Sequence, residues 1–335
     1  MSKATIIGII PGDGIGRDVI RAARIVLDAI AARFTDIAFD YREMDVGEAA
    51  MARYGSAFPD ATREGIADCD AILFGAVSAP YDFLVLSGIR YGFELYASVR
   101  PVKALPGVDV LQPDADMVVI RENTEGLYSG VGYRHGEHHV NLRVFTDRGM
   151  RRIIRFAFDW AVKNGRRKVT FTHKESILRH TDALMKDLFY EIAADCPAID
   201  AEDMEVDACA MRMVMKPQTL DVILAENANG DVLSDVGGGV VGGLGFTPSG
   251  NIGDRLAMFE PIHGSAPKHA DKDVVNPTAT LMAARMMFDY LGRPDIAGRL
   301  QDSIGRVLIE GKVRTYDIGG SSSTSQFAQA VGDGL

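Results

Sequence analysis

Apolar and polar residues alternate along the chain in two patterns. Short runs rich in isoleucine, valine and leucine predict strands, at residues 4–10, 37–44, 70–75, 116–121, 168–173 and 221–226. Between these runs, apolar residues recur every three or four positions, which predicts helices at 15–34, 60–67, 148–164, 177–195, 209–216 and 278–291. Strands that alternate with helices form largely parallel sheets, so the pattern predicts an α/β fold.

One segment departs from this scheme. In "EHHVNLRVFT" polar and apolar residues alternate directly after the turn "RHGE". Strict alternation is typical of a strand with one face in solvent. We therefore expect a hairpin arm around 131–146 rather than a core strand.

The opening stretch "TIIGIIPGDGIGRDVIRAA" joins an apolar strand to a helix through a glycine-rich turn. A dinucleotide-binding fingerprint needs glycines at relative positions 1, 3 and 6, and Gly12 and Gly14 satisfy only the first two. The sixth position is Arg17, and no Gly-Lys-Ser/Thr ending of a phosphate loop follows. The spacing therefore argues against both kinds of phosphate-binding turn.

Composition narrows the range of partners. The 335 residues carry a formal net charge of −10 and a pI of about 5.2, which argues against nucleic acid and anionic membranes as partners. The start of the sequence lacks the shape of a signal peptide, and no apolar run reaches membrane-spanning length. Three widely spaced cysteines are typical of reduced thiols. We expect a cytoplasmic protein, long enough for two domains.

Three arginines are candidates for anion binding in this acidic chain: Arg90, Arg100 and Arg121. Arginine binds carboxylates and phosphates through two parallel hydrogen bonds. Arg121 follows the strand "DMVVI", and a residue at a strand end faces the crevice where α/β proteins bind ligands. Each arginine alone is better explained by a surface ion pair, and only the three together make an anion-binding site an equal alternative.

Acidic and proton-transferring residues form the second set of candidates. Asp231 and Asp235 are four residues apart, so on a helix they share one face and repel unless a cation lies between them. Mg²⁺ or Mn²⁺ is the natural partner of such oxygen ligands, and Asp207 is a possible third ligand. Lys174 follows a strand, and a metal ion with a second cation nearby would lower its pKa enough for proton transfer. Tyr128 is the candidate for the complementary acid.

The order of the motifs resembles that of the β-decarboxylating dehydrogenases, the family of isocitrate, homoisocitrate, 3-isopropylmalate and tartrate/D-malate dehydrogenases. The matching motifs are "IPGDGIG", "LYASVRP", "RENTEGLYSG", "HKESIL", "GDVLSD", "NIGD" and "EPIHGSAPKHADKDVVNP". The resemblance implies an isopropylmalate dehydrogenase-like fold, in which two α/β domains share a large mixed sheet, and not a Rossmann fold. It implies an outer cofactor domain from 1–96 plus 243–335, and a central dimerisation domain from 97–242.

The same resemblance implies roles for the candidate residues in a homodimer with shared active sites. Arg90, Arg100 and Arg121 would bind the carboxylates of a small 2-hydroxy acid. Asp231 and Asp235 would hold Mg²⁺ or Mn²⁺ together with the partner's Asp207. The partner's Lys174 would deprotonate the 2-hydroxyl, and Tyr128 would protonate the enolate after carbon dioxide leaves.

For the nicotinamide cofactor, the resemblance implies a binding loop near the C-terminal end of the chain, with contacts from His263, Gly264, Ala266, Lys268, His269, Asn276 and Tyr316. Enzymes that use NAD usually have aspartate where this chain has Lys268. A cation there attracts a 2′-phosphate, and Lys268, His269 and Tyr316 resemble the NADP-dependent isocitrate enzymes. The arginine that completes that set is replaced by Gly320. The balance favours NADP over NAD.

Two signals disagree on the substrate. The motif "RENTEGLYSG" resembles the isocitrate and homoisocitrate branch, which predicts oxidative decarboxylation of an isocitrate-type substrate to 2-oxoglutarate. Four residues before Arg90, however, Leu86 stands where isopropylmalate enzymes carry leucine, and an apolar wall there disfavours a third carboxylate. A 3-isopropylmalate or other 3-alkylmalate dehydrogenase is therefore the alternative. A catalytically silent regulatory subunit and a phosphotransferase are weaker alternatives, because the candidate catalytic residues are all present and the phosphate-loop signature is not.

Overall fold

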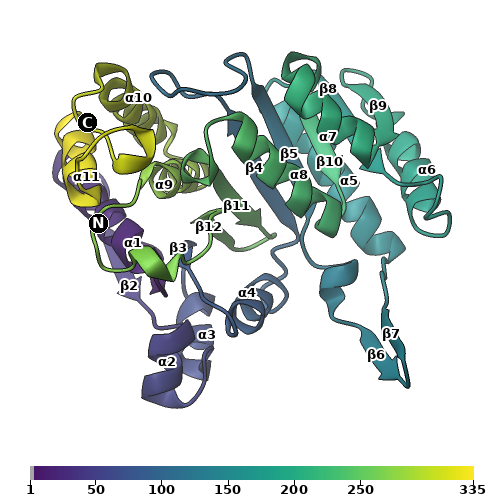
Figure 1. The fold of residues 1–335 in the computed structure, drawn as a ribbon, viewed down its shortest axis with the longest axis horizontal. Coiled ribbons are helices and arrows are strands. Elements are labelled where there is room, and N and C mark those ends of the chain that lie inside the picture. The colour runs from purple at the N-terminus through teal and green to yellow at the C-terminus, as the bar shows by residue number, and fades with distance from the viewer. Residues whose placement is uncertain (1–3) are drawn as a thin grey trace. The chain divides into compact units, whose positions relative to one another are not determined.

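The computed structural model describes residues 4–335, and the first three residues of the predicted outer domain lie outside that range. The chain divides into two compact units (Figure 1). Unit 1 comprises the chain up to Leu95, Leu105–Asp109 and Gly242–Leu335, and unit 2 comprises Tyr96–Ala104 and Val110–Val241. The short segment Leu105–Asp109 thus groups with unit 1, inside the range 97–242 expected for a single domain.

Unit 1 contains five strands in the order β2-β1-β3-β12-β11. Their bounds are β1 Thr5–Gly12, β2 Phe39–Glu43, β3 Ala71–Ala76, β11 Pro248–Ile252 and β12 Ala257–Pro261. The first four strands in this order are parallel, and β11 is antiparallel to β12. Strand β3 is buried along its whole length, as expected for a parallel strand covered on both faces.

Helices cover both faces of this part of the sheet. They are α1 Gly16–Arg33, α2 Gly47–Tyr54, α3 Asp60–Ala67, α4 Asp82–Arg90, α9 Thr278–Tyr290, α10 Pro294–Glu310 and α11 Thr324–Asp333. Because side chains alternate along a strand, Ile9 of β1 packs in a core with α1 and α9–α11, and Ile10 packs in another core with α3 and α4.

Unit 2 also contains five strands, in the order β4-β5-β10-β8-β9. Their bounds are β4 Ala97–Lys103, β5 Asp116–Glu122, β8 Lys168–His173, β9 Asp200–Glu205 and β10 Val222–Ala225. Strand β4 is antiparallel to β5, and the other neighbours are parallel. The carboxyl ends of β5, β10 and β8 therefore meet at one edge of this part of the sheet, where α/β proteins bind ligands.

The helices of unit 2 are α5 Asp147–Lys163, α6 Asp182–Ala193, α7 Val206–Met215 and α8 Asn227–Val240. Residues of α7 and α8, such as Cys209 and Leu233, share a core with Ile223 of β10, and Figure 1 shows both helices on the near face of these strands. Phe158 of α5 and Phe189 of α6 pack together, and Phe189 stacks on Phe171 of β8. The helices of unit 2 thus form two pairs.

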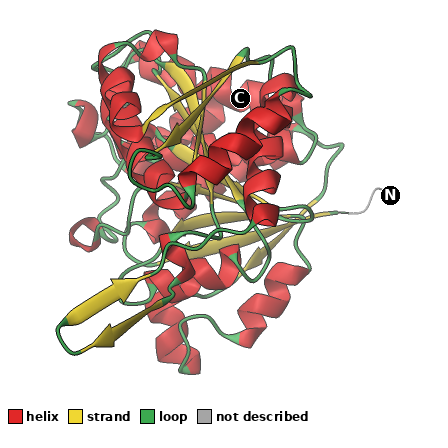
Figure 2. Cartoon of the chain, turned by 90° about the vertical axis from the view of Figure 1, so that its right-hand side faces the viewer, coloured by secondary structure: helices red, strands yellow, loops and turns green. Residues whose placement is uncertain are grey.

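The expected hairpin arm is present. Strands β6 Gly132–His135 and β7 His138–Asn141 are mostly exposed, and of the strands in residues 4–335 they pair only with each other. Figure 2 shows this two-stranded ribbon projecting from the rest of unit 2.

The predicted α/β class is confirmed, and each predicted strand and helix corresponds to an observed one. The helix predicted over 177–195 begins only at Asp182, because successive turns occupy Lys174–Thr181. Within residues 4–335, no helix has the length and apolar character needed to cross a membrane.

Candidate active site

The helix α8 begins at the end of strand β10 and carries the central aspartate of the site. The Glu226 side chain caps the helix by accepting the backbone N–H groups of Ala228 at 3.1 Å and Asn229 at 2.7 Å. Asn227, Asp231 and Asp235 then follow at intervals of four residues, so they form one polar stripe along α8.

Arg121, the sixth residue of β5, is 1% exposed and reaches this stripe. Its Nε and Nη2 donate to Oδ1 of Asn227 at 3.0 and 2.6 Å, and its Nη1 donates to Oδ1 of Asp231. A Cβ at Gly230 would lie 2.7 Å from the Arg121 side chain, so glycine permits the helix to approach this closely.

Arg100 of β4 converges on the same carboxylate. Its Nη1 donates to Oδ1 of Asp231 at 3.1 Å and to Oγ of Ser234 at 2.6 Å. Burial raises the pKa of the Asp231 carboxyl, but Arg121 and Arg100 outweigh that effect and hold the pKa below its ordinary value. Two of the three predicted arginines thus meet at one aspartate.

Tyr128 completes this cluster. It lies in the 3-10 turn Leu127–Ser129, and its hydroxyl donates to Oδ2 of Asp231 at 2.5 Å. The guanidinium carbon of Arg121 lies 4.9 Å from the centre of the tyrosine ring. Burial, followed by Asp231, raises the pKa of Tyr128, so the phenol stays protonated near neutral pH.

Asp235 is the neighbouring carboxylate on α8. Its pKa is raised by burial and by the negative charge of Asp231. Asp231 and Asp235 lie one helical turn apart, and the negative charge of one opposes ionisation of the other. A hard divalent cation bound by both carboxylates would relieve this repulsion. The donor set therefore suits Mg²⁺ or Mn²⁺.

Lys174 and Asp207 form a second cluster in unit 2. Lys174 directly follows β8, and its Nζ lies 2.7 Å from Oδ1 of Asp207 and 2.9 Å from Oε2 of Glu205. These carboxylates raise the pKa of Lys174, Asp207 having the larger effect. In a single chain, therefore, the pKa of Lys174 is raised. The sequence predicts a lowered pKa for this lysine, because it places a metal ion and a second cation beside it.

Asp207 does not join the aspartates of α8. Among residues 4–335, no three His, Cys, Asp or Glu side chains lie close enough together to hold a metal ion. Asp207, the second residue of α7, is instead paired with Lys174, and 71% of its side chain is exposed. Unit 2 therefore carries two separate clusters of predicted site residues.

A buried ion network connects these two clusters. The Asp182 carboxylate accepts the backbone N–H of Lys174 at 2.7 Å and pairs with Arg143. Arg143 also lies 3.4 Å from Glu226, the cap of α8. The carboxylates of Asp182 and Glu226 are each 3% exposed, so Arg143 neutralises two buried charges.

The third arginine, Arg90, ends helix α4 in unit 1. Its Nη2 donates to Oε1 of Glu260 at 2.8 Å, and Glu260 also accepts Asn251 Nδ2 at 2.7 Å. The Nε of Arg90 is buried without a hydrogen-bond partner in the described chain. Leu86 lies one turn earlier on the same face of α4 and packs partly against the core.

The predicted cofactor residues lie in unit 1, in the loop from His263 to Asn276 and in the 3-10 turn Tyr316–Ile318. Gly264 and Lys268 are exposed, and Ala266 has a φ of 36°. The Nε2 atom of His263 is buried without a partner, and burial lowers the pKa of this ring. A neutral imidazole with an unused nitrogen suits a hydrogen bond to a base.

Two contacts join this loop to the 3-10 turn. His269 stacks on Tyr316 with ring centres 5.8 Å apart and planes 17° apart. Asn276 Nδ2 donates to Oδ2 of Asp317 at 2.9 Å. His269 and Asn276 of the loop thus each contact a residue of the 3-10 turn, namely Tyr316 and Asp317.

Several residues of the clusters were not identified from the sequence. Asn227 and Ser234 flank the predicted aspartates on α8, and their spacing of four and three residues was an available signal. Glu205 and Arg143 had no comparable signal, because their partners come from other elements.

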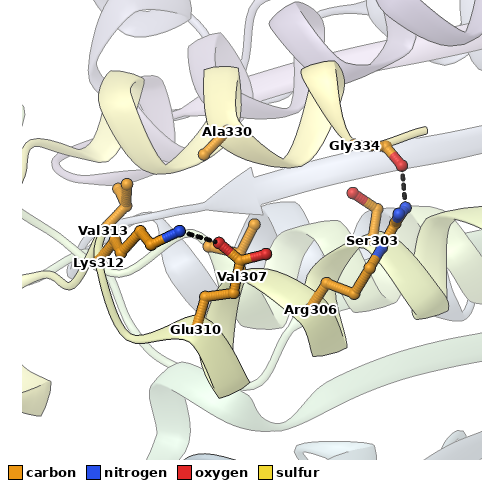
Figure 3. A pocket seen from close by; sticks show the side chains of 8 residues that line it. All are labelled: Ser303, Arg306, Val307, Glu310, Lys312, Val313, Ala330 and Gly334. Carbon is orange, nitrogen blue, oxygen red and sulfur yellow. Dashed lines mark hydrogen bonds and ion pairs between the residues drawn. The ribbon is translucent and has the colours of Figure 1, made fainter.

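A small pocket of unit 1 contains none of the predicted site residues (Figure 3). It lies between α10 and α11, where Lys312 Nζ pairs with Glu310 at 3.1 Å and Arg306 donates to the Gly334 carbonyl. Its charged groups are thus already satisfied within the chain.

Comparison with known proteins agrees with these observations. The family model described as "Isocitrate/isopropylmalate dehydrogenase" matches residues 6–331. A 3-isopropylmalate dehydrogenase of Methanothermobacter thermautotrophicus is 40% identical over 98% of this chain and 98% of its own. An isocitrate/homoisocitrate dehydrogenase of Thermus thermophilus is 42% identical over 98% of this chain and 97% of its own.

A solved structure extends the likeness to the fold. The crystal structure of isocitrate dehydrogenase from Methylococcus capsulatus superposes with a TM-score of 0.94 at 39% identity, over 98% of this chain and 99% of that one. The predicted isopropylmalate dehydrogenase-like fold, rather than a Rossmann fold, is thereby confirmed. With a family model and relatives that match almost from end to end, the chain belongs to the isocitrate/isopropylmalate dehydrogenase family and is a decarboxylating hydroxy-acid dehydrogenase.

Proposed function

We propose that the chain catalyses the NADP-dependent oxidative decarboxylation of a 3-alkylmalate. Members of this family generally use a divalent metal ion and NAD(P), bind a small hydroxy acid and are dimeric. The observation that carries the proposal is the convergence of Arg100, Arg121 and Tyr128 on Asp231. It combines two carboxylate-binding cations, a proton donor and a metal ligand in one cluster.

Substrate binding is assigned to the arginines. Arg121 is held by Asn227 and Arg100 by Ser234, so both guanidinium groups are ordered before substrate binds. Such preorganisation lowers the entropy lost on binding. Arg90, with its unused buried Nε, is assigned as a third contact to a substrate carboxylate.

Asp231 and Asp235 would hold Mg²⁺ or Mn²⁺ together with Asp207 of the partner subunit. When bound, such an ion acidifies the 2-hydroxyl of the substrate and stabilises the enolate left by decarboxylation. Tyr128, whose raised pKa keeps its proton in place, then donates that proton to C3 of the enolate.

We assign the removal of the hydroxyl proton to Lys174 of the partner subunit. Within its own chain Lys174 faces carboxylates, which raise its pKa and keep the amine protonated, so that it cannot accept a proton. In the site of a second copy it would face arginines and a divalent cation, which lower the pKa of an amine. A shared site thus gives Lys174 the electrostatic surroundings that its role needs.

The exposed side chains of α7 and α8 support a homodimer. Four apolar residues there are exposed: Met211, Val214, Met215 and Val232. Exposed apolar side chains on neighbouring helices are typical of a protein interface. We propose that a second copy covers these four residues, and light scattering of the purified protein would test this directly.

The preference for an apolar 3-substituent rests on Leu86. It shares a face of α4 with Arg90, and from Phe83 to Ile89 this helix carries no charged or amide side chain. A third carboxylate placed against such a face would lose its hydration without gaining a partner. Isocitrate is the second candidate, because the motif "RENTEGLYSG" favours that branch and one 42% identical relative acts on isocitrate and homoisocitrate.

A spectrophotometric screen with Mn²⁺ and both cofactors would test the reaction and the substrate together. We expect reduction of cofactor with 3-isopropylmalate or a shorter 3-alkylmalate, and less with isocitrate. Leu86→Asn should shift the preference towards isocitrate. Failure to reduce either cofactor with any of these acids, homoisocitrate, malate or tartrate would contradict the proposal.

The preference for NADP rests on Lys268. This side chain is exposed, and no described residue forms an ion pair with it. The next residue, His269, stacks its ring on Tyr316, and the imidazole and the phenol both carry polar groups that can hydrogen-bond to a phosphate. Lys268→Asp should shift the ratio of the kcat/KM values for NADP and NAD towards NAD. An unchanged ratio would show that Lys268 does not determine the cofactor preference.

A further inference from the structure

The end of the predicted nucleotide loop has an unfavourable backbone conformation. Asp271 and Asp273 have φ angles of 57° and 53°, in the left-handed region that residues with side chains rarely adopt. Such a conformation persists only where other contacts hold it. The question is what holds these two residues.

A single buried carboxylate in helix α1 contacts both. The Asp18 side chain has no exposed surface, its Oδ2 accepts the Asp271 N–H at 2.8 Å, and its Oδ1 accepts the Asp273 N–H at 3.4 Å. Arg21 balances its charge through Nη2 at 2.5 Å. Asp18 therefore fixes two left-handed positions, Asp271 and Asp273, in a segment more than 250 residues away along the chain.

The side chains of the two residues are held as well. Asp271 pairs with Arg17 Nη2 at 2.6 Å and with Arg21 Nη1 at 3.4 Å. Asp273 accepts the N–H and the hydroxyl of Ser325 at 2.9 and 2.8 Å. The first turn of α1 thus anchors the end of the loop on one side, and the start of α11 anchors it on the other.

The glycine-rich turn anchors the beginning of the same loop. The Ile15 N–H donates to the Ser265 carbonyl at 2.8 Å, and Ser78 Oγ donates to Ser265 Oγ at 2.9 Å. Gly14 has a φ of 56°, and a Cβ there would lie 2.0 Å from the Ser265 carbonyl oxygen. Only glycine permits this close approach.

We propose that Asp18 is a positioning residue for the nucleotide cofactor, and that the opening turn and α1 form the anchor of the cofactor loop. This inference rests on the proposed function of that loop. With Ser265 and Asp271 both fixed to the same turn and helix, only five residues, 266–270, span the gap, and Lys268 and His269 lie in its middle. An ordered loop loses less conformational entropy when it binds a ligand, so the anchor raises nucleotide affinity without touching the nucleotide.

The test is the variant Asp18→Asn, with two readouts. Asparagine keeps one acceptor and the size of the side chain but loses the charge that pairs with Arg21. We expect faster amide hydrogen exchange at Asp271 and Asp273, and a dissociation constant for NADPH about tenfold higher, as is typical for a lost charge-assisted hydrogen bond. The value of kcat at saturating nucleotide should change little, because no reacting group is altered.

Asp28→Asn is the matched control. Asp28 lies on the same helix but is 59% exposed, and its one ion pair within the described chain is with Arg24, one turn away. It should change neither hydrogen exchange in the loop nor the dissociation constant. If Asp18→Asn fails to fold, Arg17→Ala removes the exposed part of the anchor, and we expect it to raise the dissociation constant about two- to threefold.

These measurements distinguish failure of the positioning role of Asp18 from failure of the proposed nucleotide-dependent function. Unchanged exchange, or faster exchange with an unchanged dissociation constant, would overturn the positioning role of Asp18. Failure of the unmodified protein to bind either NADPH or NADH would overturn the proposed function instead. Equal effects of the Asp18 and Asp28 variants would also contradict the inference.

Discussion

The two aspartate clusters of unit 2 differ in how completely the chain builds them. Asp231 contacts two nearly buried arginines and a tyrosine hydroxyl, which leaves 38% of its side chain exposed. Asp207 has 71% of its side chain exposed and, among residues 4–335, forms an ion pair only with Lys174. The first cluster is preorganised by its own fold, and the second is half of a site that a second copy would complete.

The ion network around Arg143 explains how both clusters are placed. It connects the backbone of Lys174, through Asp182, to Glu226 at the start of α8. The guanidinium of Arg143, which is mostly buried, therefore helps to fix both clusters, although they would serve different sites of a dimer.

The largest expected effect comes from removing either aspartate. Asp231→Asn and Asp207→Asn should each lower kcat/KM by about 10²–10³-fold, because each removes charge stabilisation of the transition state. Their stabilities should differ. Asp231→Asn removes the carboxylate that two buried arginines contact and should cost about 3 kcal/mol, whereas Asp207→Asn should leave chemical denaturation unchanged. Equal stabilities would contradict the distinction between the clusters.

Arg143→Ala should have the next largest effect. It leaves the buried carboxylates of Asp182 and Glu226 unpaired, which typically costs about 3–5 kcal/mol. Arg151→Ala is the matched control, because Arg151 pairs with Glu191 on the surface and surface pairs contribute about 0–1 kcal/mol. Urea denaturation of both variants measures the difference, and a small loss for Arg143→Ala would show that the network does not hold the clusters.

The smallest expected effect is a pH dependence of the rate of amide hydrogen exchange in the cofactor loop. Arg17, followed by Arg21, lowers the pKa of Asp271 below its ordinary value of 3.8. A carboxyl with a lowered folded-state pKa contributes stability above its unfolded pKa, and that contribution is lost as the pH falls through the folded-state value. Hydrogen exchange of the loop, corrected for the intrinsic rate, should therefore be constant from neutral pH to about 5 and increase below 3.8.

The control for this effect is Asp271→Asn. Without the titrating carboxyl, the loop should exchange at one corrected rate over the same range. A loop in the unmodified protein that stays equally protected below pH 3.8 would rule out a contribution from these ion pairs.

Much of the architecture is predictable from sequence patterns. Buried parallel strands such as "AILFG" are continuous apolar runs and are easily recognised. Strand β4, "ASVRPVK", was missed because Arg100 and Pro101 interrupt its apolar pattern, and β9, "DAEDME", because acidic residues dominate it. Helix α10 was also missed, although Pro294 near its start and Gly311 after its end are available signals.

The sequence was enough to predict which residues belong to the candidate site, but not which of them contact one another. The spacing of Asp231 and Asp235 indicated a shared face, and that face is observed on α8. The convergence of Arg100 and Arg121 on Asp231 depends on how α8 packs, which Gly230 permits and no local pattern encodes. The partners of Arg143 and Asp18 lie 39 and 253 residues away, so only the fold reveals them.

Mixed dimers of two inactive variants test whether each active site is shared between the two subunits. Lys174→Ala and Tyr128→Phe should each lose about 10²–10⁴-fold in kcat, because each lacks one proton-transferring group. If Lys174 of one copy serves Tyr128 of the other, a hybrid dimer has one intact site and one site with both defects. An equal coexpressed mixture should then recover about a quarter of the activity of the unmodified protein, given random pairing in a two-fold dimer. Recovery of no activity, with hybrid dimers shown to be present, would contradict a shared site.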